Sequence, residues 1–172
     1  MHWLTRSIVR QALARSAWLA LIPLSTACDR GPAAEPAEAT EALRVTAEQF
    51  QGLRWLEGRW RGAEPGGAPF FESYRFVDDS TIQSYTYADS SFTAASDSGL
   101  IRLRGDSVTS GWPVPRYVVT AIATDSVYFA ALPGAANDFT WRFVETGHWT
   151  ARLTWDSAGV ARERIYEMRA IP

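Results

Sequence analysis

The chain has 172 residues and a formal net charge of −2, and all 17 of its basic residues are arginines. This mild acidity argues against nucleic acid binding, which needs a concentrated basic face, and the lack of lysine excludes Schiff-base and P-loop chemistry. With Cys28 as the only cysteine, no disulfide framework exists, so the stability of the fold must come from packing of its many aromatic residues.

Residues 1–27 predict an export signal. Arginines without acidic residues precede an apolar run at 17–24, which is too short to span a bilayer, and small residues at 25–27 follow. The next residue, Cys28, resembles the cysteine of a bacterial lipobox, which implies cleavage before it, lipidation of its thiol and a membrane anchor in the cell envelope. The alternative is ordinary cleavage after Ala27, which leaves a free thiol on a periplasmic or secreted protein.

Residues 28–45 predict the lipidated cysteine followed by a flexible tether. The stretch from 29 to 41 contains no large apolar residue, so it cannot bury enough surface to fold. The remainder, 46–172, is long enough for one domain with a hydrophobic core. We therefore expect a single domain held off a membrane by a tether.

A short amphipathic helix is predicted at the start of this domain. Thr46 and Gln49 have the spacing of a capping box, and apolar residues at 50, 53 and 56 follow with helical spacing. The helix is expected to end near Gly58.

Everything after Gly58 predicts strands. Short turn signals separate the β-rich runs, and we interpret six Asp-Ser dipeptides as the corners between strands. The runs cover 70–77, 81–87, 100–104, 117–124, 127–132, 139–144, 149–155 and 160–168. Several of them alternate between apolar and polar residues, which is typical of one dry and one wet face. The pattern predicts an all-β, antiparallel up-and-down barrel of about eight to ten strands with a short N-terminal plug helix.

The start of the first strand resembles the calycin barrels, which include lipocalins, fatty-acid-binding proteins and nitrobindin-like domains. It is most similar to an uncharacterised bacterial family of calycin-like small barrels with a Trp-Leu-X-Gly-X-Trp start, over about residues 50–170. The matching positions are Trp55, Leu56, Gly58 and Trp60, then Glu72 and Tyr74, then Asp138, Phe139 and Arg142. The family often has His-Asp-Phe-Pro where this chain has Asn137-Asp138-Phe139-Thr140, and the resemblance implies no established activity.

Within such a barrel, Gly58 is expected to let the helix end close against the sheet, and Trp60 to plug one end. The resemblance to lipocalins further implies an arginine of the last strand over the Trp60 ring. Arg162, Arg164 and Arg169 are the candidates.

Aromatic and arginine side chains predict a ligand pocket inside the barrel. The candidates are Tyr74, Tyr85, Tyr87, Arg102, Trp141 and Arg142. Trp141 and Arg142 must lie on opposite faces of their strand. The alternation with Phe139 and Phe143 favours an inward Trp141 and an Arg142 at the surface or rim.

His148 is the only histidine after the signal, and its position in a predicted turn favours a solvated side chain. An axial haem ligand is the alternative interpretation. The sequence contains no cluster of zinc-ligand type and no nucleophile elbow, so we expect no metal and no cofactor, and the question of catalysis stays open with a non-enzyme favoured.

The leading hypothesis is non-catalytic binding of a small apolar or amphipathic molecule near a membrane. The alternative is a structural or protein-interaction module of the bacterial envelope with a filled barrel interior, and an enzyme comes third. A cavity of several hundred cubic ångströms would favour ligand binding.

Overall fold

Thr46 begins the helical segment of the domain as a capping-box residue. Its hydroxyl accepts a hydrogen bond from the Gln49 backbone N–H, and the Gln49 side chain accepts one from the Thr46 N–H. The helix α1 (Ala47–Gln51) continues into a 3₁₀ helix, η2 (Gly52–Leu56), which buries Leu53 and Leu56. The predicted short helix that ends before Gly58 is therefore confirmed.

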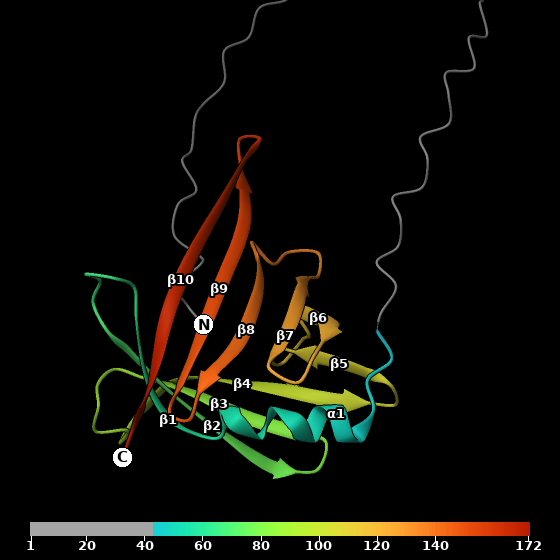
Figure 1. Ribbon diagram of the computed structural model, residues 1–172, viewed down its shortest axis with the longest axis horizontal. Helices are drawn as coiled ribbons and strands as arrows, with labels where there is room; N and C mark the ends of the chain where they lie inside the picture. Colours follow the sequence, from blue (N-terminus) through green and yellow to red (C-terminus); the bar gives the residue numbers. More distant parts are fainter. Residues whose placement is uncertain (1–42) are drawn as a thin grey trace, which may run out of the picture.

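The computed structural model describes residues 43–172, and their strands close into a ten-stranded antiparallel barrel (Figure 1). Each strand pairs with its neighbours in sequence, and β10 pairs with β1 to close the sheet. The strands are β1 (Gly58–Ala63), β2 (Phe70–Asp78), β3 (Thr81–Tyr87), β4 (Ala95–Arg104), β5 (Ser107–Ser110), β6 (Tyr117–Ile122), β7 (Ser126–Ala131), β8 (Asp138–Glu145), β9 (His148–Ser157) and β10 (Val160–Ile171). The predicted all-β, up-and-down architecture is confirmed. The predicted signal, Cys28 and the tether up to residue 42 lie outside the described residues.

Two details of the strand pattern differ from the prediction. The four-residue strand β5 begins at the serine of the Asp106-Ser107 corner and is too short to stand out in the sequence. The dipeptide Asp97-Ser98 lies inside β4 and is not a corner, because β4 begins at Ala95 and is longer than its apolar run. The other five dipeptides lie in turns or at strand ends.

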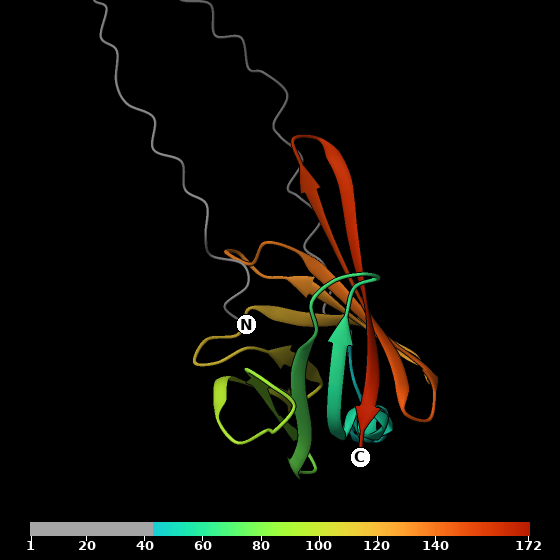
Figure 2. The ribbon, with the colours of Figure 1, turned by 90° about the vertical axis from the view of Figure 1, so that its left-hand side faces the viewer.

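The two ends of the barrel differ in how they are covered. The helices α1 and η2 lie across one end, which we call the closed end (Figure 1). The chain also enters there, since the Val45 N–H donates a 2.7 Å hydrogen bond to the carbonyl of Asp106 in the β4–β5 turn. The opposite, open end carries the β1–β2, β5–β6 and β7–β8 loops and the long β9–β10 hairpin, which rises above the other strands (Figures 1 and 2).

Inward-facing side chains of nearly every strand form one hydrophobic core, which the helices extend at the closed end. Its largest fully buried side chains include Trp149, Phe129, Phe50 and Met168. Burial of these residues removes the largest apolar areas of the chain from water and is the main stabilising term of the fold. No helix within residues 43–172 is long and apolar enough to cross a bilayer.

Candidate functional site

Four aromatic rings pack together inside the barrel and make edge-to-face contacts. We call Trp60, Tyr74, Trp141 and Trp149 the aromatic layer. The Trp149 ring is central, with its centroid 5.7 Å from that of Trp60, 6.0 Å from Tyr74 and 5.5 Å from Trp141. These separations are in the range in which aromatic pairs attract beyond simple burial of area. Trp60 of this layer lines a hollow at the closed end, whereas Tyr74, Trp141 and Trp149 line a second cavity.

A cavity of about 300 Å³ lies between the aromatic layer and the open end. Tyr74, Trp141 and Trp149 contribute to its base. Its walls come from β2, β6, β8, β9 and β10, and include Phe70, Tyr117, Phe139, Leu153, Tyr166 and Met168. This size and this mainly aromatic lining are typical of a site for one small molecule.

Glu72 faces this cavity from the inner side of β2. It is half-buried, and the Tyr74 hydroxyl donates a 2.7 Å hydrogen bond to its Oε2 atom. Period-two alternation explains the pairing, because residues 72 and 74 of one strand share a face. The result is a carboxyl group placed among aromatic side chains.

The surroundings of this pair change the acidity of both groups. Burial away from water raises the pKa of Glu72 above its usual 4.5, although the hydrogen bond from Tyr74 acts in the opposite direction. Burial, together with the neighbouring Glu72, raises the pKa of the Tyr74 phenol well above 10.0. The phenol therefore remains a hydrogen-bond donor, and Glu72 holds its proton more readily than an ordinary glutamate.

The other charged side chains that line the cavity are already engaged. Arg164 Nε lies 3.1 Å from Glu64 Oε1, and Arg116 donates a 2.9 Å hydrogen bond to the Gly134 carbonyl. Both arginines are exposed, and Arg116 precedes β6 at the open end. Charge at the mouth is therefore mixed, whereas Glu72 is the charged group that lies deeper.

The predicted pocket residues are only partly brought together. Tyr74 and Trp141 line the cavity, and Trp141 faces inward as the alternation favoured. Arg142 faces outward and forms an ion pair with Asp125 at 3.4 Å. Tyr85 and Tyr87 do not line the cavity, because Ser84 and Thr86 take the inward positions of β3.

On the outer face, these tyrosines and the predicted Arg102 have other neighbours. Tyr87 packs on Phe92, with ring centroids 4.9 Å apart, and its hydroxyl lies 3.2 Å from the Ser73 hydroxyl. The guanidinium of Arg102 lies 4.9 Å from the centre of the Trp112 ring. None of the three contributes to the interior of the barrel.

The family-motif residues near the helix connect it to the barrel. Gly58 has a φ of +135°, which other residues rarely adopt, and so lets the chain turn directly from η2 into β1. The Trp60 indole N–H donates a 2.7 Å hydrogen bond to the Leu56 carbonyl at the end of η2. Trp55 is half-buried, with its ring centroid 5.9 Å from those of Phe143 and Trp149.

The expectation of a last-strand arginine over Trp60 is not met within residues 43–172. The Trp60 ring instead packs on Trp149, and Arg164 lies 5.9 Å from the centre of the Trp155 ring. A second indole thus occupies the place that the resemblance to lipocalins gave to a guanidinium.

Asp138 and Phe139 lie on opposite faces of β8 near the open end. Phe139 is an inner wall of the cavity. The Asp138 carboxylate accepts hydrogen bonds from the Tyr128 hydroxyl, at 2.6 Å, and from the Ala131 N–H, at 2.7 Å. Asp138 therefore fixes the edge of β7 to β8, where the adjoining Phe139 enters the cavity.

The expectation that His148 is solvated is wrong. Its side chain is only 11% exposed, and its Nε2 atom lies 2.5 Å from Glu167 Oε2. Glu145 lies on the other side of the ring, at 3.8 Å. The histidine is the first residue of β9, and these two carboxylates cover its ring. Its position beside a turn in the sequence does not reveal this burial. Nowhere in residues 43–172 do three or more His, Cys, Asp or Glu side chains form a group that could hold a metal ion.

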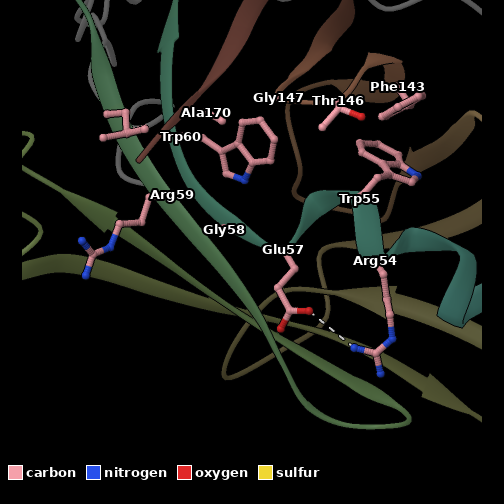
Figure 3. A pocket seen from close by; sticks show the side chains of 11 residues that line it. Arg54, Trp55, Glu57, Gly58, Arg59, Trp60, Phe143, Thr146, Gly147 and Ala170 are labelled. Atoms are coloured by element: carbon pink, nitrogen blue, oxygen red, sulfur yellow. Dashed lines mark hydrogen bonds and ion pairs between the residues drawn. The ribbon is translucent and has the colours of Figure 1, made fainter.

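A separate hollow of about 390 Å³ lies at the closed end, beneath Trp60 (Figure 3). Trp55, Phe143 and Gly147 are among the residues that line it. Its charged residues are exposed: Arg54 pairs with Glu57 at 3.4 Å, and Arg59 points away from the hollow (Figure 3). None of its charged groups is held among aromatic rings as Glu72 is, so the cavity at the open end is the stronger candidate site.

Comparison with known proteins adds no relative: no family model, no curated protein and no solved structure matches this chain.

Sequence reasoning identified Glu72 only as a family-motif position and gave it no role in the pocket. The signal that could have placed it is the shared face of Phe70, Glu72 and Tyr74 in the second strand. The opposite face, with Phe71 and Val77, is similarly apolar, so the sequence does not say which face is inside.

Proposed function

We propose that this barrel binds a small amphipathic molecule in the cavity at its open end and that it acts without catalysis. The observation that carries this proposal is the cavity of about 300 Å³, lined mostly by aromatic and aliphatic side chains with one deeper carboxyl group. Apolar walls with a single polar anchor recognise molecules that have one polar end and an apolar body.

The same proposal places the chain among the calycin-like small barrels of the bacterial envelope. The ten-stranded up-and-down barrel with a helix at its closed end is compatible with that family. The predicted export signal and the lipobox-like position of Cys28 support a lipid anchor, so that the ligand would be met near a membrane. Acyl chains contribute about 0.8 kcal/mol per buried methylene, so two or more chains would hold the protein firmly.

The alternative, a structural or interaction module with a filled interior, is less well supported. A filled barrel would leave no space above the aromatic layer, whereas here Ala151 and Thr86 place small side chains toward the cavity. Small residues at inward positions are expected where a ligand, rather than another side chain, completes the packing.

Native mass spectrometry of the protein purified from its host tests this proposal. We expect an adduct of small mass that is released on denaturation. In Ala151→Phe, a ring is added inside the cavity, so the adduct should be lost. In the control Thr150→Phe, the same ring is added at the neighbouring outward position, so the adduct should remain.

Two results would count against the proposal. An adduct-free wild-type spectrum, together with no binding of any compound in a screen of small amphipathic molecules, would favour the filled or interaction module. An adduct that persists in a folded Ala151→Phe variant would place the ligand elsewhere on the protein. Circular dichroism on the same samples shows whether each variant is folded.

A further inference from the structure

Among the charged residues of the described part of the chain, 43–172, Glu72 is unusual because it faces an aromatic cavity and has no arginine paired with it. Within residues 43–172, its side chain has one hydrogen-bond partner, the Tyr74 hydroxyl, and no ion pair with an arginine or histidine. A hydrogen bond from one phenol occupies only part of the accepting capacity of a carboxylate. The remaining capacity faces the space that a ligand would fill.

We propose that the ligand of this cavity is a small organic ammonium ion whose charged nitrogen lies beside Glu72 and whose apolar body packs against the aromatic side chains. This inference rests on the proposed function and names the class of molecule that the same site takes. A carboxylate that is partly removed from water gains most from a partner of opposite charge. Aromatic rings add to this preference, because their faces attract cations.

The number of rings around the cavity favours a cation over a neutral alcohol. Tyr74, Trp141 and Trp149 lie at its base, and further rings come from the walls at Phe70, Tyr117, Phe139 and Tyr166. Trp is the strongest cation-binding ring of the three aromatic types. A neutral ligand would use the apolar area of these rings but not their charge distribution.

The arrangement of the arginines disfavours an anionic ligand. The positive groups that line the cavity are Arg116 and Arg164, and both are exposed. Arg164 is paired with Glu64, and Arg116 is bonded to a backbone carbonyl. An anion deep in the cavity would be far from these exposed arginines and close to Glu72. The Glu72 carboxylate would repel it, and the protonated carboxyl could donate it one hydrogen bond at most.

Proton release on binding is a consequence that can be measured. Burial raises the pKa of Glu72, so the carboxyl in the empty cavity holds its proton to a higher pH than an ordinary glutamate, whereas a bound ammonium ion lowers that pKa again. The other titratable or charged groups that line the cavity are Tyr74, Glu64, Arg116, Tyr117, Arg164 and Tyr166. The arginines stay charged, and burial raises the pKa values of Tyr74 and Tyr117, so these groups do not supply the proton near neutral pH.

Three compounds that differ only at one end provide the test: 2-phenylethylamine, 2-phenylethanol and 3-phenylpropanoate. Isothermal titration calorimetry on the wild-type protein should rank the amine first, with an affinity at least about tenfold above that of the alcohol, and the carboxylate last. At a pH close to the native pKa of Glu72, titrations in two buffers with different heats of ionisation should show proton release for the amine only. Its affinity should fall as the pH is lowered through the pKa of Glu72.

Glu72→Gln separates recognition of charge from simple filling of the cavity. Glutamine keeps the size of the side chain and an oxygen that accepts from Tyr74, but it cannot become negative. We expect the amine to lose most of its tenfold advantage and all of its proton release, while the alcohol binds as before. Glu64→Gln, at the mouth, is the matched control and should leave the preference for the amine largely unchanged.

The outcomes distinguish this inference from the function on which it rests. Equal binding of all three compounds, or a preference for the carboxylate, would overturn the assignment of a cation while leaving a ligand-binding barrel. The assignment of a cation would also be overturned if none of the three compounds binds while the native adduct is present in wild type and lost in Ala151→Phe. The cavity would then bind a ligand of another class. Absence of any ligand, native or added, would overturn both.

Discussion

The Tyr74 hydroxyl donates a 2.7 Å hydrogen bond to Glu72 Oε2, two residues earlier on the same inner face of β2. Tyr74 is buried and packs edge-on against Trp141, with ring centroids 5.5 Å apart. The phenol is thus held by the aromatic layer, and it holds the carboxyl group in turn. The polar part of the site is positioned by the packing of the core rather than by a loop.

The first prediction concerns the stability of Glu72→Gln as a function of pH. The native pKa of Glu72 lies above 4.5, so the unfolded chain ionises first as the pH rises. The contribution of Glu72 to the free energy of unfolding of the wild-type protein therefore falls as the pH rises from about 4.5 to the native pKa, and above the native pKa it falls no further. At pH 7 the variant should therefore be more stable than wild type.

Denaturant unfolding of both proteins at pH 7 and at pH 4 checks this sign. Below the usual pKa, both states of the wild-type protein hold the proton, so the gain should vanish. A variant that is less stable than wild type at pH 7 would show that the native structure stabilises the carboxylate, which is the opposite of the raised pKa.

The second prediction concerns the plug at Trp60. In Trp60→Phe the hydrogen bond to the Leu56 carbonyl is lost and a gap opens beside Trp149, so the free energy of unfolding should fall by about 2–4 kcal/mol. Trp112→Phe is the matched control, because Trp112 is 55% exposed at the open end; its effect should stay within about 0.5 kcal/mol. Similar losses in the two variants would show that Trp60 is not a structural plug.

The third prediction contrasts two glycines. A Cβ at Gly62 would lie 2.2 Å from the Phe70 ring, so Gly62→Ala must displace a wall of the cavity, at a cost of about 1–3 kcal/mol. A Cβ at Gly52 meets nothing within 4 Å, and the residue is helical, so Gly52→Ala should stabilise by about 0.5–1 kcal/mol. Thermal unfolding measures both changes, and ligand titration should show weaker binding for Gly62→Ala only.

The fourth prediction concerns Asp138 and Tyr128. Burial, followed by the hydrogen bond to Asp138, raises the pKa of Tyr128 to about 12. Asp138→Asn removes the negative charge, so the pKa should move part of the way back toward 10.0. An NMR titration that follows the Tyr128 ring measures this change. An unchanged value would mean that burial alone causes the elevation.

The architecture could be predicted because its causes are local. The capping box at Thr46, the period-two alternation of β8 and the turn-forming Asp-Ser corners each act over a few residues. These signals give a helix, strands and their antiparallel order. Short connections then leave few ways to arrange consecutive strands other than side by side in one sheet.

The site could be predicted only in part because its causes are not local. The sequence of β3 presents tyrosines on one face and small residues on the other, and an inward tyrosine is the natural interpretation. In the folded barrel, inward Tyr74 already fills the space opposite Ser84, and Tyr87 packs on Phe92 outside. His148 is hidden in the same way, since Glu167 reaches it from a position nineteen residues later, on the next strand.

The hydrogen bond from Val45 to Asp106 fixes the point at which the polypeptide joins the domain. This point lies at the closed end of the barrel. An attachment of the chain before Val45 would therefore hold the domain by its closed end. The entrance to the cavity faces the other way. An attachment upstream of Val45 would therefore leave the entrance of the cavity open to the surrounding solution.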